Sequence, residues 1–355
     1  MRFVSVVGAR PQFIKLAPVS DALRQQHEEL IIHTGQHYDY CMSAQFFDEL
    51  ALPAPDYHLG VGSGTHGVQT ARMLESIEQV LLKEHPDWVV VYGDTNSTLA
   101  GSLAAAKLHI PVAHVEAGLR SFNRTMPEEI NRVVTDHLSD RLFCPTETAL
   151  LQAKREGITR GVEVVGDVMY DILLQVRSKI DDHAQMLLPG LAVTPQGYAL
   201  VTVHRAANTD DPAAMRDIAL ALNRLEMPVI FPVHPRTRAS LEQAGITWEK
   251  HIHCIEPVGY IDMLALESNA YRILTDSGGV QKEAFLLEVP CITLREETEW
   301  VETVESGWNI LVGSRWEAIV EAIDLPKPKA PRPNPFGKGD AARRIAHSLS
   351  NVKRI

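Results

Sequence analysis

Cysteine is scarce in this chain, and its positions predict no cross-link. Of 355 residues only four are cysteines, and they are widely separated, with no C-x-x-C pair: Cys41, Cys144, Cys254 and Cys291. A disulfide framework or a zinc site evident from sequence needs closer, paired spacing. The pattern is typical of reduced thiols, so we expect a cytoplasmic protein.

Long apolar runs are also missing. No stretch approaches 18 uncharged apolar residues, the length that a membrane-spanning helix needs. The apolar N-terminal run 1–8 is short and is followed by Arg10 and Lys15, which does not fit a secretory signal. We therefore expect no membrane partner.

The chain also has fewer basic than acidic residues, 34 against 45. The net charge is −11, and a nucleic-acid-binding protein would need a basic face. Phosphate groups remain candidate ligands, because locally concentrated basic residues and helix N-termini bind them even in an acidic protein. Apolar residues at 45% and charged residues at 22% indicate a globular protein, and the length suits two domains.

Short apolar runs alternate with helical periods along the whole chain. The expected strands are 3–7, 30–33, 88–92, 112–115, 142–144 and 162–165, and, in a second series, 198–203, 229–232, 252–255, 272–274 and 291–294. Segments such as 68–83 and 96–107 are expected helices. This alternation predicts an α/β protein with parallel sheets covered on both faces.

The two series predict two Rossmann-like domains. We place the first at residues 1–168 and the second at 169–339, because a polar stretch containing proline and glycine separates the series near 178–197. A Pro-rich connector at 327–333 leads to a last helix, about 340–351. We expect the terminal segment 340–355 to pack back on the first domain.

The first strand-to-helix turn has one glycine, Gly8, where a dinucleotide-binding fingerprint would have three. That difference argues against a tightly bound nicotinamide cofactor. Arg10 and Lys15 stand at the start of the following helix, where they oppose the helix dipole unless an anion lies nearby. They are either anion-binding residues or solvated surface charges.

Three carboxylates occupy positions where α/β proteins bind ligands. Asp94 and Glu116 each follow an apolar strand, and Glu128 begins a helix after Pro127. Asp94 has the alternative role of a helix N-cap, and Glu128 that of an i, i+4 partner for Arg132. Glu116 has no evident capping role. The three are candidates for proton chemistry.

The second series repeats this arrangement with other residue types. His204 and His234 each end a strand and are followed closely by an arginine. Asp276 and Ser277 precede Gly278 and Gly279 at a helix start, where backbone N–H groups can approach a phosphate. A plain capped helix explains Asp276 and Ser277 equally well, whereas the two adjacent glycines favour a ligand. These histidines and carboxylates lack metal-ligand spacing, so we predict no metal site.

Taken together, these motifs resemble the non-hydrolysing UDP-N-acetylglucosamine 2-epimerase family over nearly the whole chain. The resemblance rests on G-A-R-P-Q-F-I-K, H-T-G-Q-H, G-D-T-N-S-T, H-V-E-A-G-L-R, P-E-E-I-N-R, H-R and D-S-G-G, in that order. It implies two domains of glycosyltransferase-B type with a cleft between them. It also implies a homodimer that acts on a UDP-sugar and needs no metal or nicotinamide cofactor.

The resemblance assigns roles to individual residues. The catalytic residues it implies are Asp94, Glu116, Glu128 and His204. The substrate-binding residues it implies are Arg10, Lys15, His234, Val258, Met263, Ser277, Gly278, Gly279 and Glu283, with the uridine ring near Val258 and Met263. The implied activity interconverts UDP-GlcNAc and UDP-ManNAc by elimination of UDP to 2-acetamidoglucal and readdition.

The chain departs from the family pattern at two places. Many members carry T-E-R-P-E where this chain has the segment 298–302, with Trp300 at the arginine position. The residues of a second, regulatory UDP-GlcNAc site match at Gln36, His37 and Arg72, but the segment 38–39 differs, which argues against that regulation.

Two other activities stay open from the sequence. The first turn and Trp300 also resemble the branch acting on UDP-2,3-diacetamido-2,3-dideoxyglucuronate, which makes that sugar an alternative substrate. A glycosyltransferase on the same scaffold is an alternative from another class, since D-S-G-G and Glu283 would serve a sugar-nucleotide donor equally well. Three carboxylates in one domain suit proton chemistry better.

Overall fold

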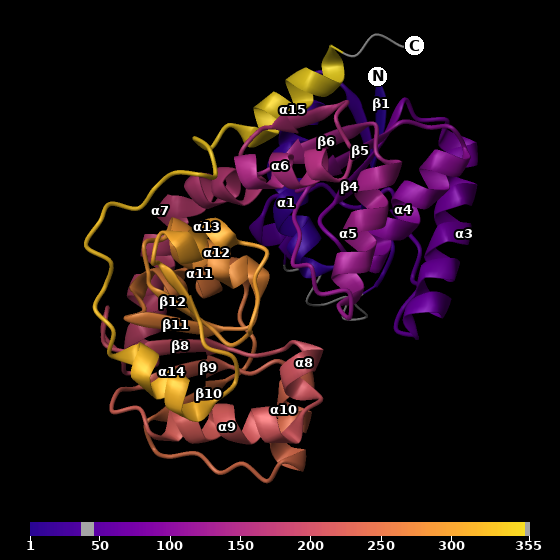
Figure 1. Cartoon of the computed structure of the whole chain (residues 1–355). Helices are drawn as coiled ribbons and strands as arrows, with labels where there is room; N and C mark the ends of the chain where they lie inside the picture. The colour runs from indigo at the N-terminus through magenta and orange to yellow at the C-terminus, as the bar shows by residue number, and fades with distance from the viewer. Residues whose placement is uncertain (37–45, 352–355) are drawn as a thin grey trace. The chain divides into compact units, whose positions relative to one another are not determined.

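The computed structural model describes residues 1–36 and 46–351 and divides into two compact units (Figure 1). Unit 1 is Met1–Gln175 with Asn334–Ile355, and unit 2 is Val176–Pro333. Cys41, His37, Tyr38 and Asp39, singled out in the sequence, lie outside the described residues. We retain the division at residue 168 as a prediction about independently folding domains.

Unit 1 is built on a parallel sheet. Among its described residues, seven strands lie in the order β3-β2-β1-β4-β5-β6-β7. Their bounds are β1 Arg2–Val7, β2 Glu28–His33, β3 Tyr57–His58, β4 Trp88–Tyr92, β5 Val112–Val115, β6 Arg141–Cys144 and β7 Val162–Val164. The strand order reverses between β1 and β4, and such a switch point opens a ligand-binding crevice at the carboxyl ends of the strands.

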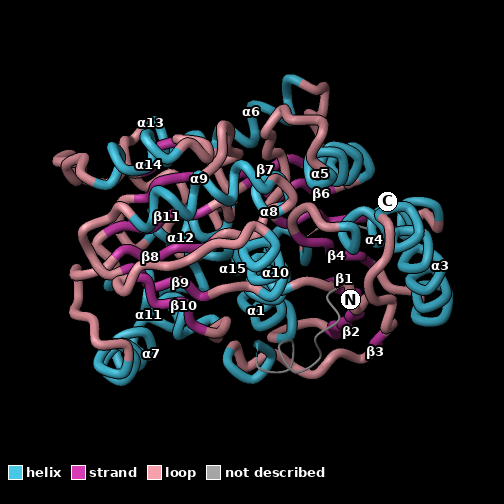
Figure 2. Tube along the Cα trace, turned by 90° about the horizontal axis from the view of Figure 1, so that it is seen from below, coloured by secondary structure: helices cyan, strands magenta, loops and turns pink. Residues whose placement is uncertain are grey.

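Helices cover this sheet. α3, α4 and α5 contact one another in succession, whereas α1 contacts α15. The bounds are α1 Arg10–Arg24, α3 His66–Glu84, α4 Asn96–Lys107, α5 Pro127–Leu138, α6 Glu147–Arg155 and α15 Ala341–Ser350. Figure 2 shows the strands of each unit with helices beside them.

Unit 2 repeats the plan with a sheet of six described parallel strands in the order β10-β9-β8-β11-β12-β13. The strands are β8 Ala199–Thr202, β9 Val229–Pro232, β10 Ile252–Ile255, β11 Arg272–Thr275, β12 Cys291–Thr293 and β13 Asn309–Leu311. The helices are α7 Val168–Gly190, α8 Ala206–Thr209, α9 Pro212–Asn223, α10 Pro235–Gln243, α11 Tyr260–Asn269, α12 Gly278–Leu286, α13 Val301–Glu305 and α14 Trp316–Ile323. The first residues of α7 belong to unit 1.

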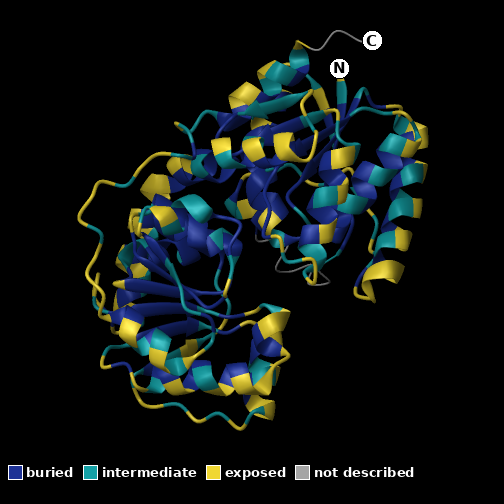
Figure 3. Cartoon of the chain, in the orientation of Figure 1, coloured by how far each residue is buried: buried dark blue, intermediate teal, exposed yellow. Residues whose placement is uncertain are grey.

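Each sheet carries the core of its unit. Every residue of β4 is buried, as expected for a parallel strand covered on both faces. In unit 1, Val4, Val6, Val89 and Val91 pack with residues of α3 and α4; a second cluster in unit 2 centres on β8 and β9. Figure 3 shows buried strands in both units and exposed residues on the outer faces of helices.

The predicted α/β class with two parallel sheets is confirmed, and most strand bounds agree within a residue or two. The sequence analysis missed β3 and β13, which have two and three residues. Runs this short carry no periodicity, and each strand forms at the margin of an existing sheet. None of the helices in the described part of the chain has the length and apolar character needed to cross a membrane.

The C-terminal helix lies against the first unit. The Asp171 carboxylate in α7 accepts the backbone N–H groups of Ala341 and Ala342, at 3.2 and 2.7 Å, so it caps the start of α15. His27, which follows α1, contacts Ser350 Oγ at 2.7 Å. The chain therefore returns to unit 1 after completing unit 2.

Candidate active site

Asp94 follows β4 and points to α5. The N-cap of α4 is Thr95, whose side chain accepts the N–H of Thr98, so the alternative role of Asp94 as that cap is wrong. The Asp94 carboxylate instead pairs with the guanidinium of Arg132 in α5. Its side chain keeps 28% of its surface exposed, enough to meet a ligand.

Arg132 links two acidic side chains. Besides Asp94, it pairs through Nη1 with Glu129 Oε2 at 2.8 Å. Glu129 in turn accepts the N–H groups of Ser121 and Phe122, at 3.0 and 2.9 Å, so the loop before α5 is tied to the same cluster. Glu128 lies half-buried in the first turn of α5. Arg132 thus pairs with Glu129, an i, i+3 neighbour in α5, and with Asp94, which lies outside the helix and which helical spacing does not predict.

Glu116 follows β5 and meets Lys15 from α1. Lys15 Nζ lies 3.0 Å from Glu116 Oε1, and both side chains are less than 10% exposed. The backbone of Glu116 has φ +69°, a left-handed conformation that costs a non-glycine residue of order 1 kcal/mol. Strain of this kind gathers at functional sites because the surrounding structure must hold it in place. The Glu116 carboxylate is therefore an anion close to Lys15, as the position of Lys15 in α1 led us to expect.

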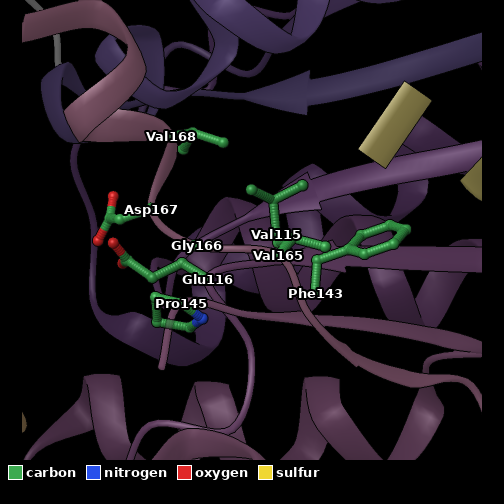
Figure 4. A pocket seen from close by; sticks show the side chains of 8 residues that line it. All are labelled: Val115, Glu116, Phe143, Pro145, Val165, Gly166, Asp167 and Val168. Atoms are coloured by element: carbon green, nitrogen blue, oxygen red, sulfur yellow. The ribbon is translucent and has the colours of Figure 1, made fainter. Parts of the chain in front are cut away.

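A small pocket at the carboxyl ends of β5, β6 and β7 includes Glu116 (Figure 4). Its lining comprises Val115, Glu116, Phe143, Pro145, Val165, Gly166, Asp167 and Val168. Figure 4 shows the carboxylates of Glu116 and Asp167 directed toward one another. Asp167 is buried and accepts the N–H of Met169 at 2.7 Å. The sequence analysis did not select Asp167, although it also follows a strand and the rule that selected Asp94 and Glu116 applies to it.

The first turn is held by a buried glutamine. Gln12 Oε1 accepts the N–H groups of Gly8 and Ala9, and Gln12 Nε2 donates to Tyr92 O at 3.0 Å. A Cβ on Gly8 would lie 1.9 Å from Thr34 Oγ1, so only glycine fits there. Arg10 is half-buried, with its guanidinium 4.6 Å from the Phe46 ring centroid. The turn therefore places Arg10 close to the end of β4, the strand that precedes Asp94.

The two histidines of unit 2 come together. The ring centroids of His204 and His234 lie 6.4 Å apart, and the side chain of His204 is 44% exposed. Asp276, fully buried after β11, accepts the N–H groups of His204 and Arg205 at 3.0–3.1 Å. His234 Nδ1 accepts the N–H of Arg236 and caps α10. Asp276 is therefore a positioning group for the His204 loop.

The start of α12 is enclosed by an acidic and an aromatic side chain. Ser277 is its N-cap residue, without a cap hydrogen bond from its side chain. A Cβ on Gly278 would lie 2.3 Å from Glu299 Oε1 and 3.3 Å from Trp300 Nε1. Gly278 is thus required by packing as well as being suited to a ligand. The sequence analysis treated the glycines as evidence for a phosphate alone.

Glu299 and Trp300 belong to the segment that departs from the family pattern. Arg295 Nη2 lies 3.0 Å from Glu299 Oε2, and Arg205 Nη2 lies 4.0 Å from Glu299 Oε1. Lys282 Nζ lies 4.2 Å from the centroid of the Trp300 ring, a cation–π distance. Three cations, Arg205, Arg295 and Lys282, are thus held by side chains of this segment close to the start of α12.

The remaining selected residues also lie near the ends of unit 2 strands. Glu283 is buried in α12, and Val258 is half-buried just before α11. Met263 N donates to Gly259 O at 3.0 Å in the first turn of α11, which places Met263 next to that loop. The structure therefore brings the selected residues together in two groups, one per unit. That the groups face one cleft stays a prediction.

No metal-binding cluster is evident among the described residues. Within residues 1–36 and 46–351, no group of three or more His, Cys, Asp or Glu side chains is arranged to hold a metal ion.

Comparison with known proteins gives a consistent result. A family model described as UDP-N-acetylglucosamine 2-epimerase matches residues 21–350. A Methanococcus maripaludis protein named UDP-N-acetylglucosamine 2-epimerase homolog is 56% identical, covering 99% of this chain and 100% of the relative. The UDP-2,3-diacetamido-2,3-dideoxy-D-glucuronate 2-epimerase of Pseudomonas aeruginosa is 49% identical, covering 99% of this chain and 100% of its own.

A solved structure extends the similarity to three dimensions. The crystal structure of Methanocaldococcus jannaschii UDP-GlcNAc 2-epimerase in complex with UDP-GlcNAc and UDP superposes with a TM-score of 0.93 at 47% identity. It covers 99% of both chains. Both units of the present chain therefore have counterparts in that protein.

Proposed function

Because the chain belongs to the UDP-N-acetylglucosamine 2-epimerase family, we propose that it inverts C2 of a UDP-sugar, interconverting UDP-GlcNAc and UDP-ManNAc. The observation that carries this proposal is the full-length similarity to 2-epimerases, combined with carboxylates held at the ends of β4 and β5. The enzyme is an isomerase, and the reaction needs no net oxidant or reductant.

The proposed route is elimination and readdition. The C2 proton of an N-acetylhexosamine is not α to a carbonyl, so direct deprotonation gives no stabilised enolate. Breaking the C1–O bond sends its electron pair to the departing UDP and leaves an oxocarbenium-like centre, and a base removes the C2 proton to form 2-acetamidoglucal. Protonation of C2 from the other face and return of UDP to C1 give the epimer, with all atoms conserved.

Unit 1 supplies the proton chemistry in this proposal. Asp94, Glu116 and Glu128 are the candidate acid and base groups, and anions near the sugar also favour the developing positive charge. Lys15 holds the Glu116 carboxylate in place at 3.0 Å, and Arg132 holds Asp94. Arg10 is proposed to bind the substrate through its charge.

Unit 2 supplies the UDP site. Ser277, Gly278 and Gly279 at the start of α12 are proposed to bind the diphosphate, which would use the N–H groups and dipole of the helix. Glu283 is proposed to bind the ribose diol, Val258 and Met263 the uridine ring, and His234 the diphosphate. His204, oriented through its backbone by Asp276, is proposed as a catalytic residue.

The diacetamido-glucuronate is a second candidate substrate. The P. aeruginosa relative that is named for this sugar is 49% identical over 99% of the chain. Both substrates undergo the same inversion at C2, so the residues proposed for unit 1 keep their roles. The difference lies in the groups at C3 and C6.

A homodimer and a cytoplasmic location also belong to the proposal. α5 exposes two apolar side chains one turn apart, Ile130 at 44% and Val134 at 38%, on a face that a second copy would cover. The cysteines, widely separated in sequence, fit a reducing compartment. Light scattering of the purified protein tests the dimer, and cell fractionation tests the location.

Proton NMR in D2O tests the reaction. With UDP-GlcNAc, deuterium at C2 together with the appearance of UDP-ManNAc would support both the activity and proton abstraction. The diacetamido-glucuronate sugar is the second arm of the experiment, and turnover there alone assigns the other substrate. If neither sugar exchanges its C2 proton, the epimerase proposal is wrong, and a glycosyltransferase assay with sugar acceptors is the next experiment.

A further inference from the structure

His114 opens the H-V-E-A-G-L-R motif, but neither the sequence analysis nor the proposed mechanism gives it a role. It lies in β5, two residues before Glu116, and is fully buried. Both ring nitrogens have close partners: Nδ1 lies 2.7 Å from Asp136 Oδ1, and Nε2 lies 2.7 Å from Gly93 O. Gly93 directly precedes Asp94. The ring therefore connects the strand end before Asp94 to the strand that leads to Glu116.

The partners fix the charge of the ring. A carbonyl oxygen only accepts hydrogen bonds, so Nε2 must carry a proton to donate to Gly93 O. Asp136 is ionised, because it also accepts from Arg120 Nη1 at 2.6 Å, and an ionised carboxylate has no proton to give. Nδ1 must then carry a proton as well. Only the imidazolium form of histidine has two N–H groups.

The surrounding charges agree with a cation here. Arg120 and His114 face Asp136, and Arg120 also pairs with Glu156 at 2.7 Å, so two cations oppose two carboxylates. Burial would raise the pKa of Asp136, but the bonds from His114 and Arg120 outweigh burial and lower that pKa. Cys144 of β6 is buried nearby, and burial raises its pKa, so its thiol adds no charge.

Asp136 also reaches the loop after Glu116. The backbone N–H of Gly118 lies 3.1 Å from Asp136 Oδ2. A Cβ on Gly118 would lie 2.4 Å from Ala149 O, so this loop has little room to move. One buried network therefore contacts the backbone on both sides of Glu116 and immediately before Asp94.

We propose that His114 is a positioning residue: an imidazolium whose two N–H groups fix the Gly93 carbonyl and, through Asp136, the loop carrying Glu116. The inference rests on the proposed function, because it gives Asp94 and Glu116 their alignment for proton transfer. Loss of the Nε2–H frees the Gly93 peptide before Asp94, and loss of the Nδ1–H loosens Asp136 and the loop that carries Glu116. The substrate contacts proposed for unit 2 remain intact, so kcat falls while KM holds.

Nitrogen NMR of protein labelled with ¹⁵N-histidine tests the charge without substrate. We expect one histidine with both ring nitrogens in the imidazolium range at about pH 8, where a free imidazole with a reference pKa of about 6.5 is mostly neutral. His114→Gln assigns this signal by its loss. Asp136→Asn provides a second assignment, because removal of the carboxylate should convert the same ring to the neutral Nε2–H form.

Kinetics test the positioning role. His114→Gln should lower kcat about 100-fold, the cost of a small misplacement of catalytic groups, with KM changed by less than about threefold. The exposed His347 of α15 gives the matched control, His347→Gln, with wild-type kcat. A ring that is neutral at pH 7 overturns the inference even when the wild type epimerises its substrate. An unchanged kcat in a folded His114→Gln variant does so too.

Discussion

Lys15 Nζ and Glu116 Oε1 form a 3.0 Å ion pair in which both side chains are almost inaccessible to solvent. A buried charge is tolerated only when it is paired, so each residue depends on the other for its ionised state. α1 and the end of β5 are thereby joined at a strained backbone position, Glu116. The Glu116 carboxylate, one of the three acid–base candidates, is thus paired and fixed in place by the fold of unit 1.

Removing one partner of this pair should destabilise the protein strongly. Lys15→Met leaves a buried carboxylate without its cation, and we expect a loss of about 3 kcal/mol in the free energy of unfolding. Adding Glu116→Gln should recover part of that loss, with a coupling energy of about 1–3 kcal/mol in urea unfolding. Arg2 and Glu28, an exposed pair at 3.0 Å, form the control cycle, where coupling should be small. Additive effects at Lys15 and Glu116 would contradict a direct interaction.

Asp94 should be essential for turnover. Asp94→Asn keeps the size of the side chain but removes the charge, and we expect kcat to fall at least about 100-fold while UDP affinity changes little. Arg132→Gln should also lower kcat, because Asp94 and Glu129 lose their common partner. Arg124→Gln, at an exposed arginine before α5, is the control. Wild-type turnover in Asp94→Asn would remove Asp94 from the mechanism.

Arg10 should act mainly on binding. It lies half-buried at the first position of α1, where its charge suits the substrate diphosphate better than proton transfer. We expect Arg10→Ala to raise KM about tenfold and to change kcat less. The exposed Arg343 of α15 provides the matched alanine variant. Steady-state kinetics that leave KM unchanged would place Arg10 outside the substrate site.

Chelation should leave the activity unchanged. The proposed chemistry uses carboxylates, lysine and histidine, and the sequence analysis found no ligand spacing for a metal. We expect turnover after dialysis against EDTA to stay within about twofold of the untreated enzyme. Strong inhibition that Zn²⁺ or Mg²⁺ reverses would instead make His204 and His234 candidate metal ligands.

Asp171 should make stability depend on pH. Burial raises the pKa of its carboxyl to about 6, and the N–H groups of Ala342 and Ala341 offset only part of that effect. The unfolded value is about 4, so the folded protein binds this proton more tightly. Its contribution to stability is therefore fully present below about pH 4 and is lost as the pH rises through about 6.

Urea unfolding between about pH 4 and about pH 7 measures this contribution. Relative to Asp171→Asn, the wild type should lose roughly 1 kcal/mol of unfolding free energy across that interval. Asp21→Asn, at an exposed position in α1, corrects for other titrating groups. A difference that is constant or grows with pH would show that Asp171 does not hold an extra proton in the native state.

The strands and the contacts of the candidate residues can be predicted from the sequence to different extents. The short apolar runs locate β4, β5, β9 and β10 to the residue, and in β4 and β5 every residue is buried. The strand-end rule also selects Asp94 and Glu116. It cannot predict that Arg132 pairs with Asp94, since that contact depends on how α5 approaches the end of β4.

Other parts of the site carry no local sequence signal. The strained φ of Glu116 and the contact of Lys15 with it arise from the packing of α1 against the sheet. The approach of Glu299 to Gly278 joins residues that are far apart in the chain. In the sequence, nothing distinguishes His114 from the other residues of its apolar strand. Its role depends on the acceptors that face both ring nitrogens, and these appear only in the structure.

The capping of α15 by Asp171 has a consequence for biosynthesis. Unit 1 comprises residues 334–355 as well as 1–175, so a segment that is made after unit 2 completes a unit begun before it. During translation, the face of α1 that α15 covers stays open while all of unit 2 is synthesised. A nascent chain stalled before residue 334 would therefore be a more favourable client for chaperones than the released protein.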